Sequence, residues 1–254
     1  MTQPHLWPAS DVLIQASALL QVRPELKLRP DAQDIAKAEY GHFIAQTFYF
    51  ERLGVEIVSD LEKNAERPNQ KDFFHNQLED ERRHVDVYRE LIEQMPACYV
   101  PAPCIEKLRD SIIHGGSFHE KVIQGLVVLE ALAIGLFSAR IRYFPNGLSY
   151  ESDLQTVVEE GRHHRHAVEI VAEMIKEERL SYGAVVDIVR SGIKHISSDL
   201  LPIDVAKTFK VDLSDTEILA LQGKGIVGAQ RRVTLNSIKS ALRVLSLTNG
   251  PEAF

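Results

Sequence analysis

The sequence is poor in cysteine, in positive charge and in long hydrophobic runs, and each shortage excludes a class of protein. Its 254 residues include two cysteines, Cys98 and Cys104, without a CxxC spacing. They could bridge or bind metal, but we expect free thiols in a reducing cytoplasm. The formal charge of −7 argues against general nucleic-acid binding, which needs a basic surface.

Targeting and membrane signals are lacking as well. The opening residues, MTQPHLWPAS, contain no basic stretch followed by an apolar one, so no secretion signal is visible. The longest apolar run, Val122–Phe137, is shorter than a bilayer span and carries a glutamate near its centre. We therefore expect a soluble, cytoplasmic protein that does not contact a membrane.

No linker rich in proline, glycine or serine divides the chain, so residues 1–254 are expected to form one domain. Helical periodicity dominates and alternating strands are lacking, which predicts an all-α fold. The segment GKGIVG, residues 223–228, satisfies GxGxxG, but no strand precedes it and dinucleotide binding is not expected. Long helices are predicted over residues 31–64, 70–94, 117–143 and 152–178, with Ser152 as the N-cap of the last. Shorter helices are predicted over residues 182–197, 203–209, 215–221 and 235–247.

The connections between the long helices predict their arrangement. The first and second helices have a short connection, as do the third and fourth, so each pair should be antiparallel. The link between the pairs, residues 95–116, is long enough to run the length of the molecule. Two hairpins joined by one long crossover form a ferritin-like four-helix bundle. The core should cover about residues 31–178, with a helical extension over 179–254.

One short motif occurs twice. DERRH, residues 80–84, and EEGRH, residues 159–163, both read acid, Glu, any residue, Arg, His. In each copy the Glu and the His are three residues apart and share one helix face. A further glutamate lies thirty residues before each copy, Glu51 before Glu81 and Glu130 before Glu160. One Glu from each of two helices and Glu-x-x-His from each of the other two is the di-iron or di-manganese carboxylate pattern.

Glu130 argues that this pattern is more than four unrelated acids. Between Val122 and Phe137 the only other polar side chain is Gln124, so the helix is apolar almost all round and should be buried. A buried carboxylate without a partner of opposite charge costs several kcal/mol. No Lys or Arg lies within one turn, and a metal would supply the missing charge. A third Glu-x-x-His, Glu39 to His42, lacks the preceding acid and is expected to be structural.

The first acid of each motif also has an expected role. Asp80 and Glu159 each lie four residues before a histidine, and a metal-bound histidine needs an acceptor for its second N–H. In the bundle these acids could serve the histidine of the opposite helix. Arg83 and Arg162 could pair with the acids or extend into solvent.

These motifs resemble those of the ferritin-like di-iron oxygenase superfamily, and the resemblance covers about residues 31–178. The superfamily includes soluble acyl-carrier-protein desaturases, arylamine N-oxygenases, aldehyde-deformylating oxygenases and a tRNA hydroxylase. DERRH and EEGRH are most similar to the desaturase-type pair. The N-oxygenases add a histidine one turn before the second Glu-x-x-His, where this sequence has Thr156.

The resemblance implies two bound iron ions, with manganese an alternative in one or both sites. It also implies an enzyme that activates O2 to oxidise a C–H, N–H or aldehyde group of a small organic substrate, with an external electron donor. The implied metal ligands are Glu51, Glu81, His84, Glu130, Glu160 and His163. Side chains one turn from the ligands, Thr47, Leu126 and Ile134, are expected to line the substrate pocket.

Alternatives remain open at this point. Iron storage or peroxide detoxification without an organic substrate needs the same ligands, although residues 179–254 would have no role in a minimal ferritin bundle. A metal-free helical interaction protein is disfavoured by Glu130. The basic stretch Lys224–Arg243 could dock an acidic carrier protein or be a solvated helix face. A homodimer is compatible with all of these.

Overall fold

The described part of the protein is helical throughout. The structure, a computed structural model, describes residues 32–94, 100–101, 103–145, 147–196, 214 and 225–248. Across those ranges every regular element is a helix and no β-strand occurs. The all-α prediction is therefore confirmed for them. The helices predicted over residues 203–209 and 215–221 lie outside the described residues.

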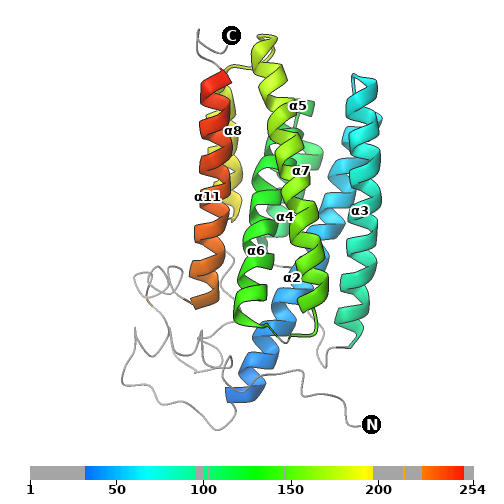
Figure 1. The fold of residues 1–254 in the computed structure, drawn as a ribbon, viewed down its shortest axis with the longest axis vertical. Coiled ribbons are helices and arrows are strands. Elements are labelled where there is room, and N and C mark those ends of the chain that lie inside the picture. Colours follow the sequence, from blue (N-terminus) through cyan, green and yellow to red (C-terminus); the bar gives the residue numbers. More distant parts are fainter. Residues whose placement is uncertain are drawn as a thin grey trace.

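The first antiparallel pair consists of α2 (Ala32–Lys63) and α3 (Pro68–Glu93), which pack along each other (Figure 1). Both match the predicted segments to within two residues. The second helix begins where Pro68 occupies the first helical positions and Arg67 is extended. Proline is well suited to this position because its fixed φ is helical and its missing N–H would have no helical partner.

The second pair consists of a continuous helical run from Phe118 to Tyr143 and the antiparallel α7 (Tyr150–Lys176). The run begins with a capping box in which the Ser117 hydroxyl accepts from the Glu120 N–H and the Glu120 carboxylate accepts from the Ser117 N–H. The prediction that Ser152 caps the next helix was wrong. The N-cap is Ser149, whose hydroxyl does not cap the helix but donates to the Asp153 carboxylate, 2.8 Å away.

The long run is not one uniform α-helix. It contains α5 (Phe118–Lys121), the π-helix η3 (Val122–Leu129) and α6 (Glu130–Tyr143). All eight residues of η3 are buried. By length and composition the run could cross a membrane, but 83% of its most apolar window is buried inside the protein. Its apolar character is therefore accounted for by the core.

The connection between the two pairs contains helices that the sequence did not predict. In Figure 1, α3 ends at the lower end of the molecule and α5 begins near the upper end, so the chain crosses its length. The connection includes α4 (Pro103–Arg109) and η2 (Asp110–His114). These short elements form because Ile105, Leu108 and Ile112 are buried in the main hydrophobic core, and tertiary burial outweighs weak local preference.

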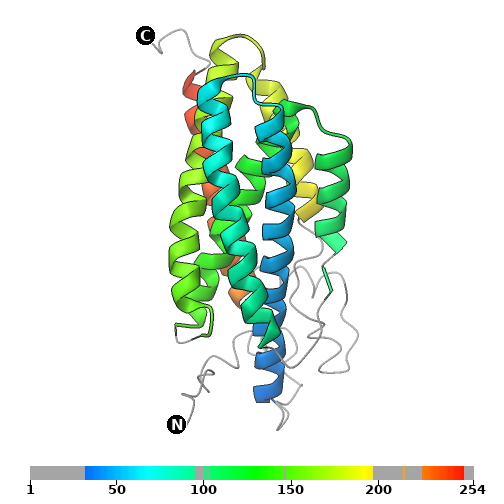
Figure 2. The same ribbon diagram turned by 90° about the vertical axis from the view of Figure 1, so that its right-hand side faces the viewer.

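Two further helices cover the second pair. The first, α8 (Tyr182–Ile196), agrees with the prediction, whereas α11 (Gly225–Thr248) begins ten residues before the predicted start at Leu235. Ile226 and Ala229 are buried against the second core cluster, which stabilises a helical start that contains glycine. Figures 1 and 2 show α11 lying along α6 and α7.

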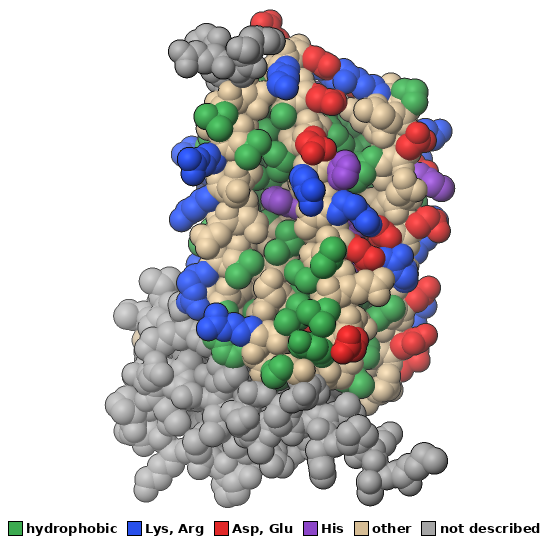
Figure 3. Space-filling view, viewed as in Figure 1, with side chains coloured by type: hydrophobic (Ala, Val, Ile, Leu, Met, Phe, Trp, Pro, Cys, Tyr) green, Lys and Arg blue, Asp and Glu red, His purple; other side chains and the backbone are tan. Residues whose placement is uncertain are grey.

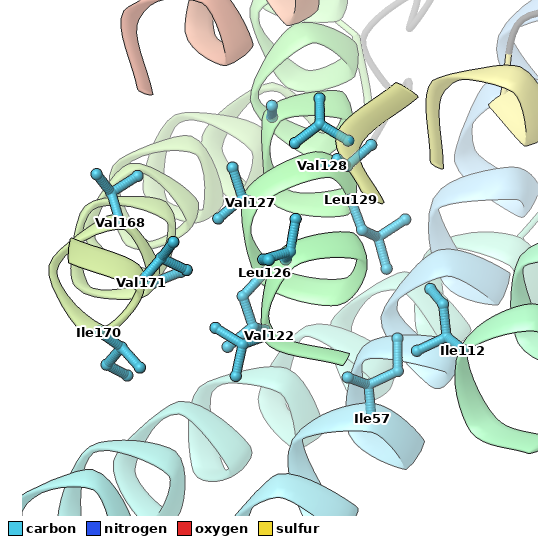
Figure 4. Packing of buried hydrophobic residues seen from close by; sticks show 14 of the residues in the cluster. Ile57, Ile112, Val122, Leu126, Val127, Val128, Leu129, Val168, Ile170 and Val171 are labelled. Carbon is cyan, nitrogen blue, oxygen red and sulfur yellow. The ribbon is translucent and has the colours of Figure 1, made fainter. Parts of the chain in front are cut away.

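The main core surrounds η3 and fixes the start of α6 in the interior. In Figure 4, Leu126 and Val127 face Val168 and Val171 of α7, while Ile57 of α2 lies on another side. Gly125 allows α2 to come close, because a Cβ at this position would lie 2.7 Å from the Ile57 Cγ2. Glu130 follows η3 directly as the first residue of α6. The close packing around η3 leaves its side chain buried.

Candidate metal centre

The residues of the duplicated motif converge in the interior. Their ligand atoms form two groups, and within each group all the atoms lie within 4.8 Å of one another. Glu81 of α3 and Glu160 of α7 belong to both groups. Glu51 of α2 and His84 of α3 complete the first group, and Glu130 of α6 and His163 of α7 complete the second. The two halves of the cluster therefore have the same composition, two shared carboxylates with one further carboxylate and one imidazole each.

The cluster is buried and carries more negative than positive charge. None of its six side chains is more than 5% exposed. Within the described ranges no lysine or arginine forms an ion pair with its four carboxylates, whose charged neighbours are the two histidines. Two histidines cannot balance the charge of four ionised carboxylates, and buried charge without a partner is strongly unfavourable. The cluster must therefore hold additional protons or metal ions.

The pKa values of the carboxyl groups show this imbalance. Burial, and then the neighbouring carboxylates, raise the pKa of Glu81 and of Glu130 well above the ordinary value. Burial raises the pKa of Glu51 as well. Burial also acts to raise the pKa of Glu160, but hydrogen bonds with Glu130, His163 and His84 outweigh it and lower that pKa. Without metal, neutral acids and charged carboxylates share the site.

The two histidines are held as cations when no metal is present. Burial acts to lower the pKa of His84, but Glu51 and Glu160 outweigh it and raise the pKa to about 12. Burial likewise opposes protonation of His163, yet Asp80, Glu160 and Glu81 raise its pKa to about 10. Metal ions would replace these protons, because a ligating imidazole must be neutral.

Each histidine presents one ring nitrogen to the cluster and the other to an outer carboxylate. The Nδ1 of His84 lies 3.1 Å from Glu51 Oε2, and its Nε2 lies 2.7 Å from Glu159 Oε2. The Nε2 of His163 lies 3.2 Å from Asp80 Oδ2. The acid of each motif thus contacts the histidine of the other helix, in the crossed arrangement expected from the sequence. Such contacts fix which nitrogen can bind a metal.

Arginines hold the outer carboxylates in place. Arg83 lies 2.9 Å from Asp80 Oδ1 and 2.8 Å from Glu159 Oε2, so a single guanidinium connects both histidine–carboxylate pairs. Arg162 also binds Asp80. The hydrogen bond to His163, and then the contact with Arg83, hold the pKa of Asp80 well below its usual range. Both arginines are therefore paired, and the alternative of simple extension into solvent is wrong.

Two residues of the site were missed in the sequence. The Gln77 amide donates to Glu81 Oε1 at 3.2 Å and to Glu130 Oε1 at 2.8 Å. Its position one helical turn before Glu81 was the available signal. Gly54 is the second, because a Cβ there would lie 2.7 Å from Glu81 Oε2. A larger residue would displace a carboxylate that both halves share.

The residues expected to line a substrate pocket do not share one environment. The Thr47 hydroxyl donates to the Phe43 carbonyl and accepts from Arg140. Leu126 is buried in the core, and Ile134 is half-buried. A cavity of about 220 Å³ lies between α2 and α4, and none of the three lines it. Their role at a substrate stays a prediction.

The other histidines of the motif region lie apart from the cluster. His164 is half-buried, and burial lowers its pKa, whereas the pKa of His163 is raised. The His166 ring stacks on Phe73 with a centroid separation of 4.7 Å. The side chains of Glu39, His42 and His195 lie outside the described residues.

A second buried polar cluster, the Arg140 network, lies on the same helices as the first, with Asp153 seven residues before Glu160 and Tyr88 four residues after His84. Arg140 of α6 binds both carboxylate oxygens of Asp153, and its third nitrogen donates to the Phe43 carbonyl at 3.1 Å. The hydroxyls of Tyr88 and Ser149 donate to the same carboxylate at 2.9 and 2.8 Å. Its one cation and one anion balance, so this network needs no further ion.

The first cluster has side chains that could hold a metal ion. Four carboxylates and two imidazoles form a mixed oxygen and nitrogen donor set, which no thiolate joins among the side chains that the structure describes. The Oε1 of Glu160 has no aligned hydrogen bond, although it lies 3.1 Å from His84 Nδ1. A carboxylate oxygen that lies beside an imidazole without an aligned hydrogen bond fits a metal ligand. No family model, curated protein or solved structure matches the chain.

Proposed function

We propose that the protein is a ferritin-like four-helix bundle with a non-haem di-iron centre, and that it uses O2 to oxidise a small organic substrate. The observation that carries the proposal is the pair of buried ligand groups that share Glu81 and Glu160. Two metal ions that share two carboxylates would occupy a site of this composition. Manganese in one or both positions would suit the same donors.

The ligand set divides into shared and terminal groups. Glu81 and Glu160 would contact both ions, Glu51 and His84 one ion, and Glu130 and His163 the other. Bound iron would supply the reduction of O2, which these side chains cannot perform alone. Gln77 would orient Glu130 and Glu81 through its amide, and Glu159 and Asp80 would keep each imidazole Nδ1 directed at the centre.

The surrounding core would protect the reaction from water. Leu126, Val127 and Phe137 are buried beside the motif-bearing helices, and water-free surroundings limit loss of reactive species to solvent. Electrons beyond those of the substrate would come from an external donor, and the reaction would take place in the cytoplasm. The basic stretch Lys224–Arg243 could dock an acidic carrier protein, and a solvated helix face stays the alternative for it.

Metal content is the first test. Protein expressed aerobically in iron-rich medium should contain about two iron or manganese ions per chain, measured by elemental analysis. Glu169 is exposed on the same helix as Glu160, so Glu169→Gln is the matched control for Glu160→Gln. The control should retain both ions and Glu160→Gln should lose at least one. A single zinc per chain, or no metal after reconstitution, would contradict the dinuclear proposal.

Turnover is the second test. Anaerobic protein loaded with Fe²⁺ should react slowly with O2 alone and faster with the correct acyl, aldehyde or amine compound, followed by stopped-flow absorbance and product analysis. Native mass spectrometry of the purified protein can identify a co-purified candidate. Rapid oxidation of many added irons per chain, unaffected by any organic compound, would instead support iron storage.

A further inference from the structure

One face of α7 is exposed and carries an ordered sequence of side chains. Leu154 and Val158 are large hydrophobic residues with exposures of 38% and 71%. Glu151 precedes them and Arg165 follows them, and both are exposed. With Gly161, the five positions are separated alternately by three and four residues. These five positions lie on one stripe about 21 Å long, because such spacing returns to the same helix face.

Figure 3 shows the same order on the surface. Hydrophobic side chains gather over the lower half of α7, with basic side chains above them and an acidic one below. Most exposed hydrophobic residues occur singly and need no explanation. Here two occur one turn apart on one helix, between charges of opposite sign, which is the pattern of a helix contact.

The charges of the stripe match those of a second, antiparallel copy of the same stripe. Arg165 lies seven residues after Val158, and Glu151 lies seven residues before it. If two α7 helices cross antiparallel with Val158 at the centre, each Glu151 lies opposite the Arg165 of the other copy. In a two-fold contact this pair occurs twice, because residue i meets j and j meets i.

The groups of the stripe are free to make these contacts. Neither Glu151 nor Arg165 forms an ion pair with any other described residue. Gly161 has no atom within 4 Å of where its Cβ would lie. A second helix can therefore approach this side of α7 closely without displacing a side chain of its own chain.

We propose that this stripe is a homodimer interface, in which α7 packs antiparallel on α7 of a second copy around Val158. The hydrophobic residues supply the contact and the two Glu151–Arg165 pairs set its register, since exposed ion pairs contribute specificity more than affinity. The occupant is a second copy of this chain because the charges match those of the same stripe and no other partner need be assumed.

The association state and its register can be tested together. Sedimentation velocity on the full chain should show a concentration-dependent dimer, and Val158→Glu should raise its dissociation constant by about tenfold or more. Val244 is also exposed, at 50%, but lies on α11, so Val244→Glu is the matched control and should leave the dimer unchanged. Circular dichroism of each variant separates loss of association from loss of folding.

Charge exchange tests the pairing itself. Glu151→Arg alone and Arg165→Glu alone should each weaken the dimer, because each places like charges opposite one another twice. The double variant should recover most of the association. In a background with Cys98 and Cys104 replaced by serine, Val158→Cys should form a disulfide between copies under oxidation, whereas Val244→Cys should not.

Each alternative outcome has a definite meaning. A monomer at all concentrations would overturn the proposal. A dimer that Val158→Glu does not weaken would place the interface elsewhere and would also overturn it. Failure of the double charge variant to recover association, with no Val158→Cys cross-link, would overturn the antiparallel register. None of these results depends on the metal centre, so the proposed function is tested separately.

Discussion

Two buried polar clusters lie on the same helices and differ in how their charges balance. The Arg140 network pairs one guanidinium with one carboxylate, and Tyr88, Ser149 and Thr47 complete its hydrogen bonds. The metal cluster has four carboxylates and two imidazoles. Its raised carboxyl pKa values show that it takes up protons to remain buried.

The difference shows which buried polar groups indicate a ligand. Burial is almost complete in both clusters, so burial alone does not separate structure from site. The Arg140 network is complete as it stands, which is typical of a structural ion pair. The candidate metal cluster needs protons or metal ions to balance its carboxylates, and this imbalance is the physical argument for proposing bound metal. Changes to each cluster should therefore have opposite consequences.

The largest expected effect comes from breaking the balanced network. Arg140→Met leaves Asp153 buried without its cation, which should lower the free energy of unfolding by about 3–5 kcal/mol whether or not metal is present. Chemical denaturation in the presence of a chelator measures this change. Arg142 lies on the same helix but is exposed, so Arg142→Met should stay within about 0.5 kcal/mol. A loss below about 1 kcal/mol for Arg140→Met would contradict the comparison.

The metal cluster should respond in the opposite direction. Glu130→Gln removes an ionisable group whose pKa is raised by burial. The metal-free protein should gain about 1–3 kcal/mol at neutral pH, while at least one metal ion is lost. Denaturation with chelator and elemental analysis without it provide the two measurements. Destabilisation of the metal-free variant would show that the buried Glu130 carboxyl group is not unfavourable. Normal binding of two ions would show that Glu130 is not a ligand.

A smaller effect is expected at the rim of the cluster. Arg83→Gln removes the group that connects Asp80 to Glu159, and metal affinity should fall by about 10–100-fold. Competition with a chromophoric chelator measures this affinity. Arg82 is adjacent and pairs with Glu79 alone among the described residues, so Arg82→Gln should bind metal as the parent does. Equal effects from the two substitutions would point to general surface charge instead.

A further expected effect is a dependence on pH. His84 and His163 have folded-state pKa values of about 12 and about 10, above the ordinary 6.5. The stability they contribute is present below pH 6.5 and is lost as the pH rises toward the folded-state values. The Tm of metal-free protein should therefore fall as the pH rises from roughly 7 to 9. The Tm of metal-loaded protein should stay level, because metal has replaced those protons. A metal-free Tm that rises with pH would contradict the charge assignment.

The parts of the fold that the sequence predicts are those with strong local signals. The apolar period places the long helices, and each of their ends lies within two residues of the predicted one. The equal spacing from Glu51 to Glu81 and from Glu130 to Glu160 predicts that these residues lie at matching heights in two antiparallel pairs. Their convergence follows once the pairs pack together.

The parts that the sequence does not predict depend on contacts between distant segments. The segment with Ile105, Leu108 and Ile112 is too short to show a helical period, and it folds because those side chains enter the core. The pairing of Tyr88 with Asp153 joins residues 65 positions apart. The π-helical winding of η3 has no residue pattern of its own, because apolar residues occupy every face.

The sharing of Glu81 and Glu160 has a consequence for how the protein would respond to metal supply. A first ion would use both shared carboxylates yet leave one histidine and one glutamate without a partner. A second ion would then find both shared carboxylates deprotonated, but it would still displace the proton of the remaining histidine and enter beside the charge of the first ion. Prior deprotonation favours the second ion and charge repulsion opposes it. The steepness of metal uptake would therefore report which of the two effects is larger.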